Sequence, residues 1–180
     1  IKKMKIIKTK LKDLLIIKQK NNFDFRGSLR ETFNKKILNK KFIFEYCTTS
    51  KANALRGFHF QYKFQQAKYV SVLKGKILDY VIDLRKNSNT FGKTFKIILS
   101  DKNCLSLYIP EGFAHAYYSY DKFNVVYYKL TNYYKPKFED GINLLDKDLK
   151  LNWPKKRFSI SKKDKKLQRF KDFRKIYKFL

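Results

Sequence analysis

The sequence predicts a mainly β protein with a β-sandwich or jelly-roll fold. About nine short runs rich in β-branched and aromatic residues recur at roughly ten-residue spacing, and turn-forming residues separate them. The composition fits a folded chain, because 43% of the residues are hydrophobic and 17% are aromatic. The expected strands cover residues 14–18, 42–46, 54–61, 67–73, 77–84, 94–99, 105–109, 114–119 and 124–130.

Glycine, proline and small polar residues mark the connections between these strands. Lys74-Gly75-Lys76 lies between two of them and predicts a tight hairpin. A short helix is expected at residues 31–39, and an amphipathic helix at about 162–179, where apolar residues recur every three or four positions. A chain of 180 residues suits one domain, so we expect residues 1–180 to form one unit with its jelly-roll core at about 42–130.

The chain is strongly basic, with 43 Lys and Arg against 15 Asp and Glu and a formal net charge of +28. Such a charge is typical of proteins that bind nucleic acid or another anionic surface. The lysines are, however, spread along the whole chain among many Asn, Ile, Phe and Tyr residues, as AT-rich coding bias also produces. Interleaved acidic turns and the absence of a recognisable binding module argue against nucleic acid, which stays the alternative from a different functional class.

Cysteine usage and hydropathy bear on the compartment. Cys47 and Cys104 form no CxxC motif and no disulfide framework, so a reducing cytoplasm is expected. No apolar run reaches the roughly 18 residues of a transmembrane helix, and the first residues do not resemble a secretory signal. We therefore expect a cytoplasmic protein with no membrane partner.

The run Leu-Arg-Gly-Phe-His-Phe-Gln at residues 55–61 carries a candidate catalytic base, His59. A neutral imidazole is an effective general base near neutral pH, although a lone histidine on a strand is also common as a structural residue. His115, the other histidine, follows a Pro-Glu-Gly turn, where it either points toward the same cavity or merely starts a strand. Because metal sites cluster three or four ligands, these two distant histidines predict no metal site.

Other ionisable side chains could complete such a site. Tyr128 is either a rim residue or a proton donor. Asp164 follows Ser161 by three positions, which indicates helix capping, although a carboxylate there could instead fold over the sheet and orient a histidine. The chain has no glycine-rich phosphate loop, so cationic side chains would have to hold an anionic ligand. The candidates for that role are Arg26, Arg56, Lys68 and Lys163.

Taken together and in order, the motifs of this chain resemble those of the dTDP-4-dehydrorhamnose 3,5-epimerase family. The resemblance extends from about residue 11 to about residue 166. The matching motifs are Phe25-Arg26-Gly27, Glu31-Thr32-Phe33, Leu55-Arg56-Gly57-Phe58-His59-Phe60-Gln61, Gln66-Ala67-Lys68, Val81-Ile82-Asp83-Leu84-Arg85, Ser88-Asn89-Thr90-Phe91-Gly92-Lys93, Ile109-Pro110-Glu111-Gly112-Phe113-Ala114-His115, Tyr128-Lys129, Asn132-Tyr133-Tyr134 and Ser161-Lys162-Lys163-Asp164.

The resemblance implies a cupin-type jelly roll, a double-stranded β-helix with short helices, that works as a homodimer without a cofactor. It also implies an isomerase acting on a nucleotide-linked 4-keto-6-deoxy sugar, converting dTDP-4-dehydro-6-deoxyglucose to dTDP-4-dehydrorhamnose for surface polysaccharide. In such a sugar the C4 ketone acidifies the protons on C3 and C5, so that both carbons can be inverted by proton transfer.

The resemblance also implies a role for each site residue. His59 would remove the protons, Asp164 would orient His59, and Tyr128 would return a proton from the opposite face of the ring. Lys68 would stabilise the enolate oxygen, where negative charge develops in the transition state. The positions expected to contact the nucleotide, diphosphate or sugar, some of them from the neighbouring subunit, are Arg26, Glu31, Arg56, His115, Tyr134, Glu139 and Lys163.

The chain departs from the family at Phe44-Glu45-Tyr46, where the family usually has Gln-x-Asn. Such a change leaves the reaction class better defined than the substrate. An epimerase that inverts only C3 or C5 is one alternative. A ketoisomerase on another nucleotide sugar, or a non-catalytic sugar-nucleotide binder with the same barrel, is another.

Overall fold

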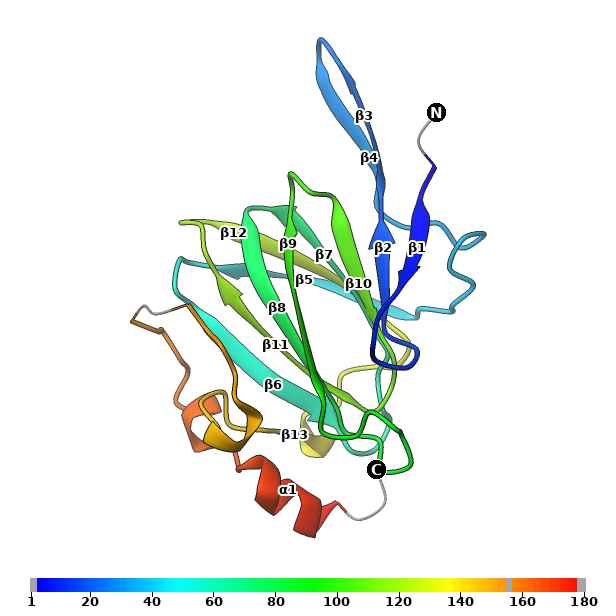
Figure 1. Ribbon diagram of the computed structural model, residues 1–180. Coiled ribbons are helices and arrows are strands. Elements are labelled where there is room, and N and C mark those ends of the chain that lie inside the picture. The colour runs from blue at the N-terminus through cyan, green and yellow to red at the C-terminus, as the bar shows by residue number, and fades with distance from the viewer. Residues whose placement is uncertain (1–2, 155–156, 178–180) are drawn as a thin grey trace.

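The computed structural model of the protein describes residues 3–154 and 157–177. Its strands form two antiparallel sheets that face each other around a common interior (Figure 1). One sheet has the strand order β1-β2-β10-β7-β12-β5, the other has the order β13-β6-β11-β8-β9, and β3 and β4 form a separate hairpin. This architecture is the mainly β jelly roll that the sequence predicts.

The first sheet contains β1 (Lys5–Lys8), β2 (Leu15–Lys18), β10 (Leu105–Ile109), β7 (Lys68–Lys74), β12 (Asn124–Leu130) and β5 (Phe44–Ser50). The second contains β13 (Glu139–Gly141), β6 (Leu55–Gln61), β11 (Phe113–Ser119), β8 (Lys76–Asp83) and β9 (Thr94–Ser100). The hairpin is β3 (Lys20–Asp24) with β4 (Gly27–Glu31). Four short helices complete the described chain: η1 (Pro136–Phe138), η2 (Lys147–Leu149), η3 (Asp164–Lys166) and α1 (Phe170–Ile176).

Among the described residues the hydrophobic core forms three clusters, two of which lie on opposite faces of the second sheet. Ile77 and Val81 of β8 pack between the two sheets. Tyr80 and Ile82 point to the outer face of the same strand and pack against residues that follow β13, including Trp153. We call residues 142–154 and 157–177 the C-terminal segment. Because β8 is buried on both faces, its sequence is an almost continuous apolar run rather than an alternating one.

The chain turns a corner at Gly75, so the hairpin predicted at Lys74-Gly75-Lys76 is wrong. β7 pairs with β10 and β12, whereas β8 pairs with β9 and β11 in the other sheet. Gly75 has a φ of +86°, and a Cβ at this position would lie 2.7 Å from the carbonyl oxygen of Phe123. Short-range turn chemistry does not distinguish a hairpin from a corner, because a glycine suits both.

The helix predicted at residues 31–39 is also wrong. Glu31 belongs to β4 and lies opposite Lys20 of β3. The next residues follow an irregular path, in which Phe33 packs edge-on against Tyr69 with ring centroids 5.6 Å apart. Only one turn forms, closed by a 3.0 Å hydrogen bond from the Leu38 N–H to the Asn34 carbonyl. Anchoring of the aromatic ring outweighs the helical pattern of this segment.

The helix predicted at about 162–179 is broken into η3 and α1, and residues 178 and 179 lie outside the described residues. Between the two helices Gln168 is extended and forms a parallel bridge with Ile142. The first N–H of α1, at Phe170, donates to Asp146 Oδ2 at 2.6 Å. The apolar spacing still places Phe173 in the core, but tertiary contacts divide the helix.

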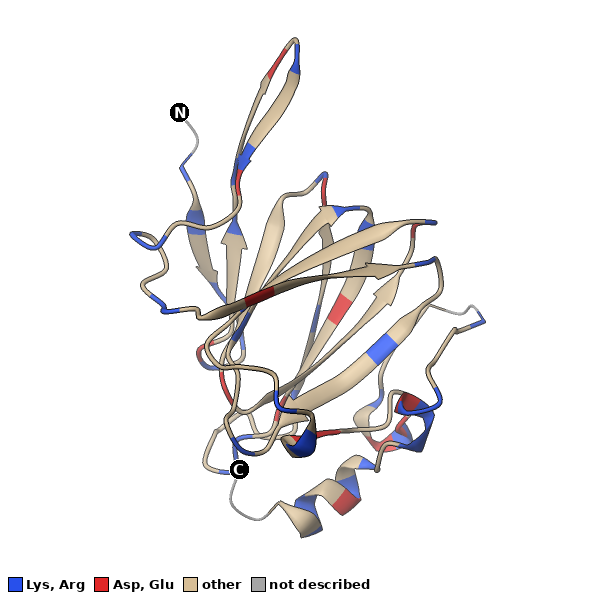
Figure 2. Ribbon diagram, turned by 180° about the vertical axis from the view of Figure 1, so that it is seen from behind, with Lys and Arg blue, Asp and Glu red and all other residues tan. Residues whose placement is uncertain are grey.

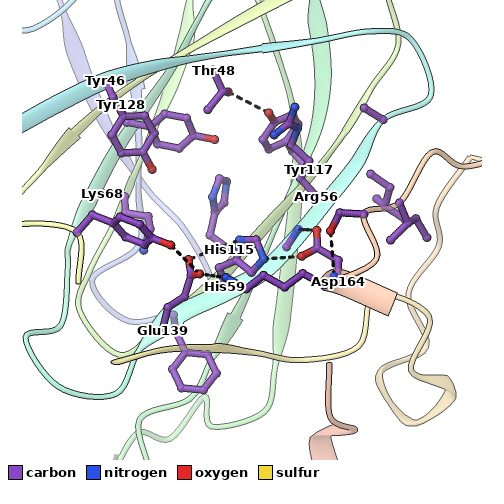
Figure 3. Close-up of a pocket in the computed structure, with 18 of the residues that line it drawn as sticks. Tyr46, Thr48, Arg56, His59, Lys68, His115, Tyr117, Tyr128, Glu139 and Asp164 are labelled. Carbon is purple, nitrogen blue, oxygen red and sulfur yellow. Dashed lines mark hydrogen bonds and ion pairs between the residues drawn. The ribbon is translucent and has the colours of Figure 1, made fainter. Parts of the chain in front are cut away.

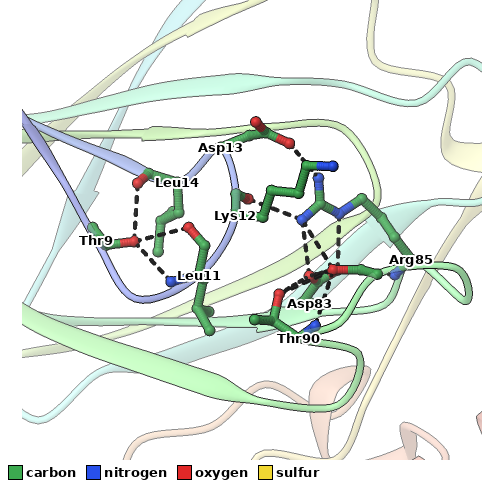
Figure 4. A network of polar contacts seen from close by, with 9 residues as sticks. Thr9, Leu11, Lys12, Asp13, Leu14, Asp83, Arg85 and Thr90 are labelled. Carbon is green, nitrogen blue, oxygen red and sulfur yellow. Dashed lines mark hydrogen bonds and ion pairs between the residues drawn. The ribbon is translucent and has the colours of Figure 1, made fainter.

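Arg85 ties the N-terminal loop to the end of β8 (Figure 4). Its guanidinium donates to Asp83 and Asp13 and to the Lys12 carbonyl, each at 2.9 Å. The side chain of Thr9 shapes the same loop by donating to the Leu14 carbonyl at 2.9 Å. The first strands are therefore fixed against the body of the jelly roll.

The β3–β4 hairpin projects beyond the body of the jelly roll (Figure 1). Its side chains are unusually exposed for their type, with 98% exposure at Phe25, 77% at Phe23 and 69% at Leu29. We call β3 and β4 with their turn the arm. Apolar side chains in such a position indicate a surface that another molecule covers.

In the view of Figure 2, charged residues are spread over loops, the arm and the C-terminal segment. They do not cluster in one region of that view. Within the described ranges, 3–154 and 157–177, no helix has the length and apolar character needed to cross a membrane.

Candidate active site

A cavity of about 470 Å³ lies between the two sheets, next to the C-terminal segment (Figure 3). Its volume is in the range of small-molecule sites. The lining combines cations, carboxylates, imidazoles and phenols. The predicted site residues that line it are Arg56, His59, Lys68, His115, Tyr128, Tyr134, Glu139, Lys163 and Asp164.

His59 is held by a buried carboxylate. Its Nε2 lies 2.8 Å from Asp164 Oδ1, and the other oxygen of Asp164 accepts the Gly57 N–H at 3.3 Å. Burial alone would raise the pKa of Asp164, but the hydrogen bond and charge of His59, with the N–H of Gly57, outweigh it and lower that pKa. Asp164 is therefore an anion that orients the imidazole and leaves Nδ1 on the side of the cavity where Glu139 lies, 4.0 Å away.

The local backbone explains how this pair forms. Gly57 has a φ of +109°, and a Cβ there would lie only 2.7 Å from Ala116 Cα and would clash with the His115 carbonyl. A glycine two residues before His59 therefore lets β6 approach β11 closely. Asp164 stands at the start of η3, where its own N–H donates to Ser161 Oγ at 3.0 Å. Ser161 thus caps the turn, and the Asp164 carboxylate remains available for His59.

Lys68 brings a buried ammonium to the cavity from the first residue of β7. Its side chain is 7% exposed and makes no hydrogen bond to any residue that the structure describes. Burial lowers the pKa of Lys68 to about 8, and the charge of Glu139 only partly opposes this effect. A cation that is so poorly solvated can interact strongly with negative charge on a ligand.

Tyr128 points into the cavity from β12. Its ring lies edge-on to His115 with centroids 5.9 Å apart, and it stacks on Tyr46 at 4.8 Å. Burial raises the pKa of Tyr128 well above its usual value, and the neighbouring Tyr117 and Tyr46 add to this effect. The phenol therefore stays protonated at physiological pH, as a proton donor must.

His115 has a carboxylate partner of its own, Asp79, that sequence reasoning missed. Nε2 of His115 lies 2.7 Å from Asp79 Oδ2, and both side chains are buried. Burial raises the pKa of Asp79, against the effect of His115. The only signal for Asp79 was a charged residue in the middle of the apolar run of β8, which is unusual unless the charge is paired.

Glu139 contacts two other polar side chains that line the cavity. Its Oε2 accepts from the Tyr134 hydroxyl at 3.0 Å and forms an ion pair with Lys163. Burial lowers the pKa of Lys163, but the hydrogen bond to Glu139 outweighs it and leaves that pKa raised. Arg56, three residues before His59 on β6, also lines the cavity. Its guanidinium donates to the Thr49 carbonyl at 3.1 Å.

Two predicted site residues, Arg26 and Glu31, do not line this cavity. Arg26 lies at the tip of the arm, where it pairs with Asp24 at 2.7 Å. Glu31 lies at the base of the arm and accepts a hydrogen bond from Asn34. Tyr46, at the departure from the family pattern, also lines the cavity, as do Thr48 and Tyr117, which sequence reasoning missed. Their signal was weak because tyrosine and threonine are ordinary strand residues.

The described residues contain no group of three or more His, Cys, Asp or Glu side chains arranged to hold a metal ion. The cavity instead places an oriented imidazole, a buried ammonium and a protonated phenol around one space. The fold and this set of groups define a cupin-type isomerase.

Comparison with known proteins identifies the family. The sequence profile of the dTDP-4-dehydrorhamnose 3,5-epimerase family matches residues 8–172, and the chain belongs to this family. A curated relative, dTDP-4-dehydrorhamnose 3,5-epimerase of Methanothermobacter thermautotrophicus, is 39% identical over 155 residues, which cover 83% of this chain and 84% of the relative.

Two solved structures are similar over almost the whole chain. dTDP-4-dehydrorhamnose 3,5-epimerase from Elizabethkingia anophelis is 37% identical with a TM-score of 0.88, covering 95% of this chain and 98% of the other. The dTDP-6-deoxy-D-glucose-3,5-epimerase from Legionella pneumophila, in complex with dTDP-4-keto-L-rhamnose, is 36% identical with a TM-score of 0.88, covering 92% of each chain.

Proposed function

We propose that this protein inverts C3 and C5 of a dTDP-linked 4-keto-6-deoxy sugar, converting dTDP-4-dehydro-6-deoxyglucose to dTDP-4-dehydrorhamnose. One observation carries the proposal: His59, oriented by Asp164 at 2.8 Å, lines the same cavity as the protonated phenol of Tyr128. Family membership and the Legionella complex with dTDP-4-keto-L-rhamnose support the choice of substrate.

The mechanism that we propose has two proton transfers at each carbon. Nδ1 of His59 takes the proton from the carbon beside the C4 ketone, and the electron pair moves to O4 as an enolate. The ammonium of Lys68 stabilises this enolate in a poorly solvated site, where charge is most effective. The enolate then collapses as the carbon takes the phenolic proton of Tyr128 on the opposite face, and solvent exchange restores both side chains.

The remaining cavity residues would bind the rest of the ligand. Arg56, His115 and Lys163 offer donors for the diphosphate and sugar, and Tyr134 offers a flat ring for the base. We propose that residues 1–180 work as one epimerase domain that needs no cofactor, in a cytoplasmic setting that suits the free Cys47 and Cys104.

We also propose a homodimer in which each subunit completes the site of the other. Arg26 and Glu31 are substrate-binding candidates, yet they lie on the arm and outside the cavity of their own chain. The exposed apolar residues of the arm favour burial against a second copy. The arm would then carry these polar side chains to the partner's cavity.

Deuterium exchange tests the reaction. The protein is incubated in D₂O with dTDP-4-dehydro-6-deoxyglucose, and the sugar nucleotide is analysed by mass spectrometry. We expect two deuterons in the product and the loss of exchange in His59→Asn, while Cys47→Ser serves as a surface control that exchanges normally. One deuteron would favour the single-site alternative, and no exchange on this or another dTDP-4-keto sugar would refute the proposal.

A further inference from the structure

Tyr46 stacks directly on Tyr128, the proposed acid, and no sequence pattern indicated this contact. The two residues are direct cross-strand partners in the register of β5 and β12. Their rings stack with centroids 4.8 Å apart and an interplanar angle of 26° (Figure 3). Directly paired aromatic side chains on one face of a sheet restrict each other's rotation.

Tyr46 is also part of the cavity wall. It lines the cavity, and its hydroxyl makes no hydrogen bond to any residue in the described part of the chain. Burial raises the pKa of Tyr46, with a contribution from the charge of Glu139, so the phenol is neutral. The ring of Phe44 also packs against Tyr46, tilted by 53° with centroids 5.6 Å apart. Tyr46 is therefore held in place and exposed to a ligand at the same time.

The position of the acid matters for the number of carbons that react. C3 and C5 lie on opposite sides of C4, so one base and one acid can serve both only if the sugar or a side chain moves between the two reactions. A misplacement of about 1 Å can cost roughly 10²-fold in rate. A phenol held by a stacked neighbour therefore serves one carbon better than the other.

We propose that Tyr46 is a positioning and specificity-determining residue: its stacked ring holds Tyr128 in place and sets the relative rates at which the two carbons exchange. This inference rests on the proposed function. It assigns to the chain a bias toward one carbon, built into β5 at the position where the sequence departs from its family.

The experiment uses dTDP-4-dehydro-6-deoxyglucose as substrate in D₂O. It measures the rate at which the second deuterium is incorporated, divided by the rate for the first. Tyr46→Phe keeps the stack and removes the hydroxyl, whereas Tyr46→Asn and Tyr46→Leu remove the stack. Tyr127→Phe is the control, because it removes a phenol from β12 that bonds to Glu45 away from the cavity. Thermal denaturation confirms folding, and Tyr46→Leu retains apolar packing if Tyr46→Asn unfolds.

We expect the ratio to rise at least threefold in Tyr46→Asn and Tyr46→Leu and to stay within twofold of the wild type in Tyr46→Phe and Tyr127→Phe. If the wild type incorporates one deuteron, the variants without the stack should gain the second. The inference is overturned if the ratio is unchanged in Tyr46→Asn and Tyr46→Leu, or if Tyr46→Phe changes it as much as they do. In either case the proposed function still holds, because the protein exchanges deuterium. A wild type that exchanges no deuterium overturns both.

Discussion

At the residue scale, the pairing of His59 with Asp164 should contribute far more to the rate of turnover than to the stability of the fold. In Asp164→Asn the amide can donate to Nε2, which would stabilise the tautomer with its proton on Nδ1 and remove the base. We expect kcat to fall by roughly 10²- to 10⁴-fold with KM little changed, as for a lost general base. Steady-state kinetics and a thermal melt would measure both effects, and near-wild-type kcat in the folded variant would contradict the role of Asp164.

The buried ammonium of Lys68 makes a prediction about pH. Burial lowers its pKa to about 8, so Lys68 is charged below this pH and neutral above it. Because only the charged form of Lys68 would stabilise the proposed enolate, the rate should fall as pH rises through about 8. Lys68→Arg keeps its charge at high pH. The basic limb of the pH–rate profile should therefore disappear in this variant, and an unchanged limb would assign the titration to another group.

At the scale of elements, the arm should work in trans. If the arm residues Arg26 and Glu31 complete the partner's cavity, the double variant Arg26→Ala, Glu31→Ala and the single variant His59→Asn should each be inactive alone. A mixed dimer pairs an intact arm with an intact His59, so mixing and re-equilibration should restore up to about a quarter of wild-type activity by random pairing. A mixture that stays as inactive as its components would show that the arm acts within its own chain or not at all.

Most strands of the jelly roll were predictable because short runs rich in β-branched and aromatic residues recur along the chain and turns separate them. Two of the exceptions come from contacts with distant parts of the chain. Gly75 is a corner because β7 and β8 find partners in different sheets, and the C-terminal helix breaks where Gln168 bridges to Ile142. β13 has only three residues, too short for any periodicity to indicate it.

At the scale of the whole molecule, the net charge of +28 should act on substrate capture. The proposed substrate carries a diphosphate, and its attraction to a basic protein is screened over a Debye length of about 10 Å at 0.1 M salt. Raising KCl from ~0.02 M to ~0.5 M should therefore raise KM several-fold and leave kcat unchanged. Kinetics at matched osmolality would measure this. A constant KM together with competitive inhibition by duplex DNA would instead favour a nucleic-acid role.

The candidate site could be predicted only in part from the sequence, for a physical reason. His59, Lys68, Tyr128 and Asp164 could be named through the order of motifs, and the structure brings all four to one cavity. The stack of Tyr46 on Tyr128 depends on cross-strand register, which no motif encodes.

The contact between His59 and Asp164 joins residues 105 positions apart. Asp164 therefore reaches His59 only when the C-terminal segment is docked against β6. Under the proposed mechanism, turnover depends on this docking, which makes the C-terminal segment a part of the working site rather than a cover for the barrel.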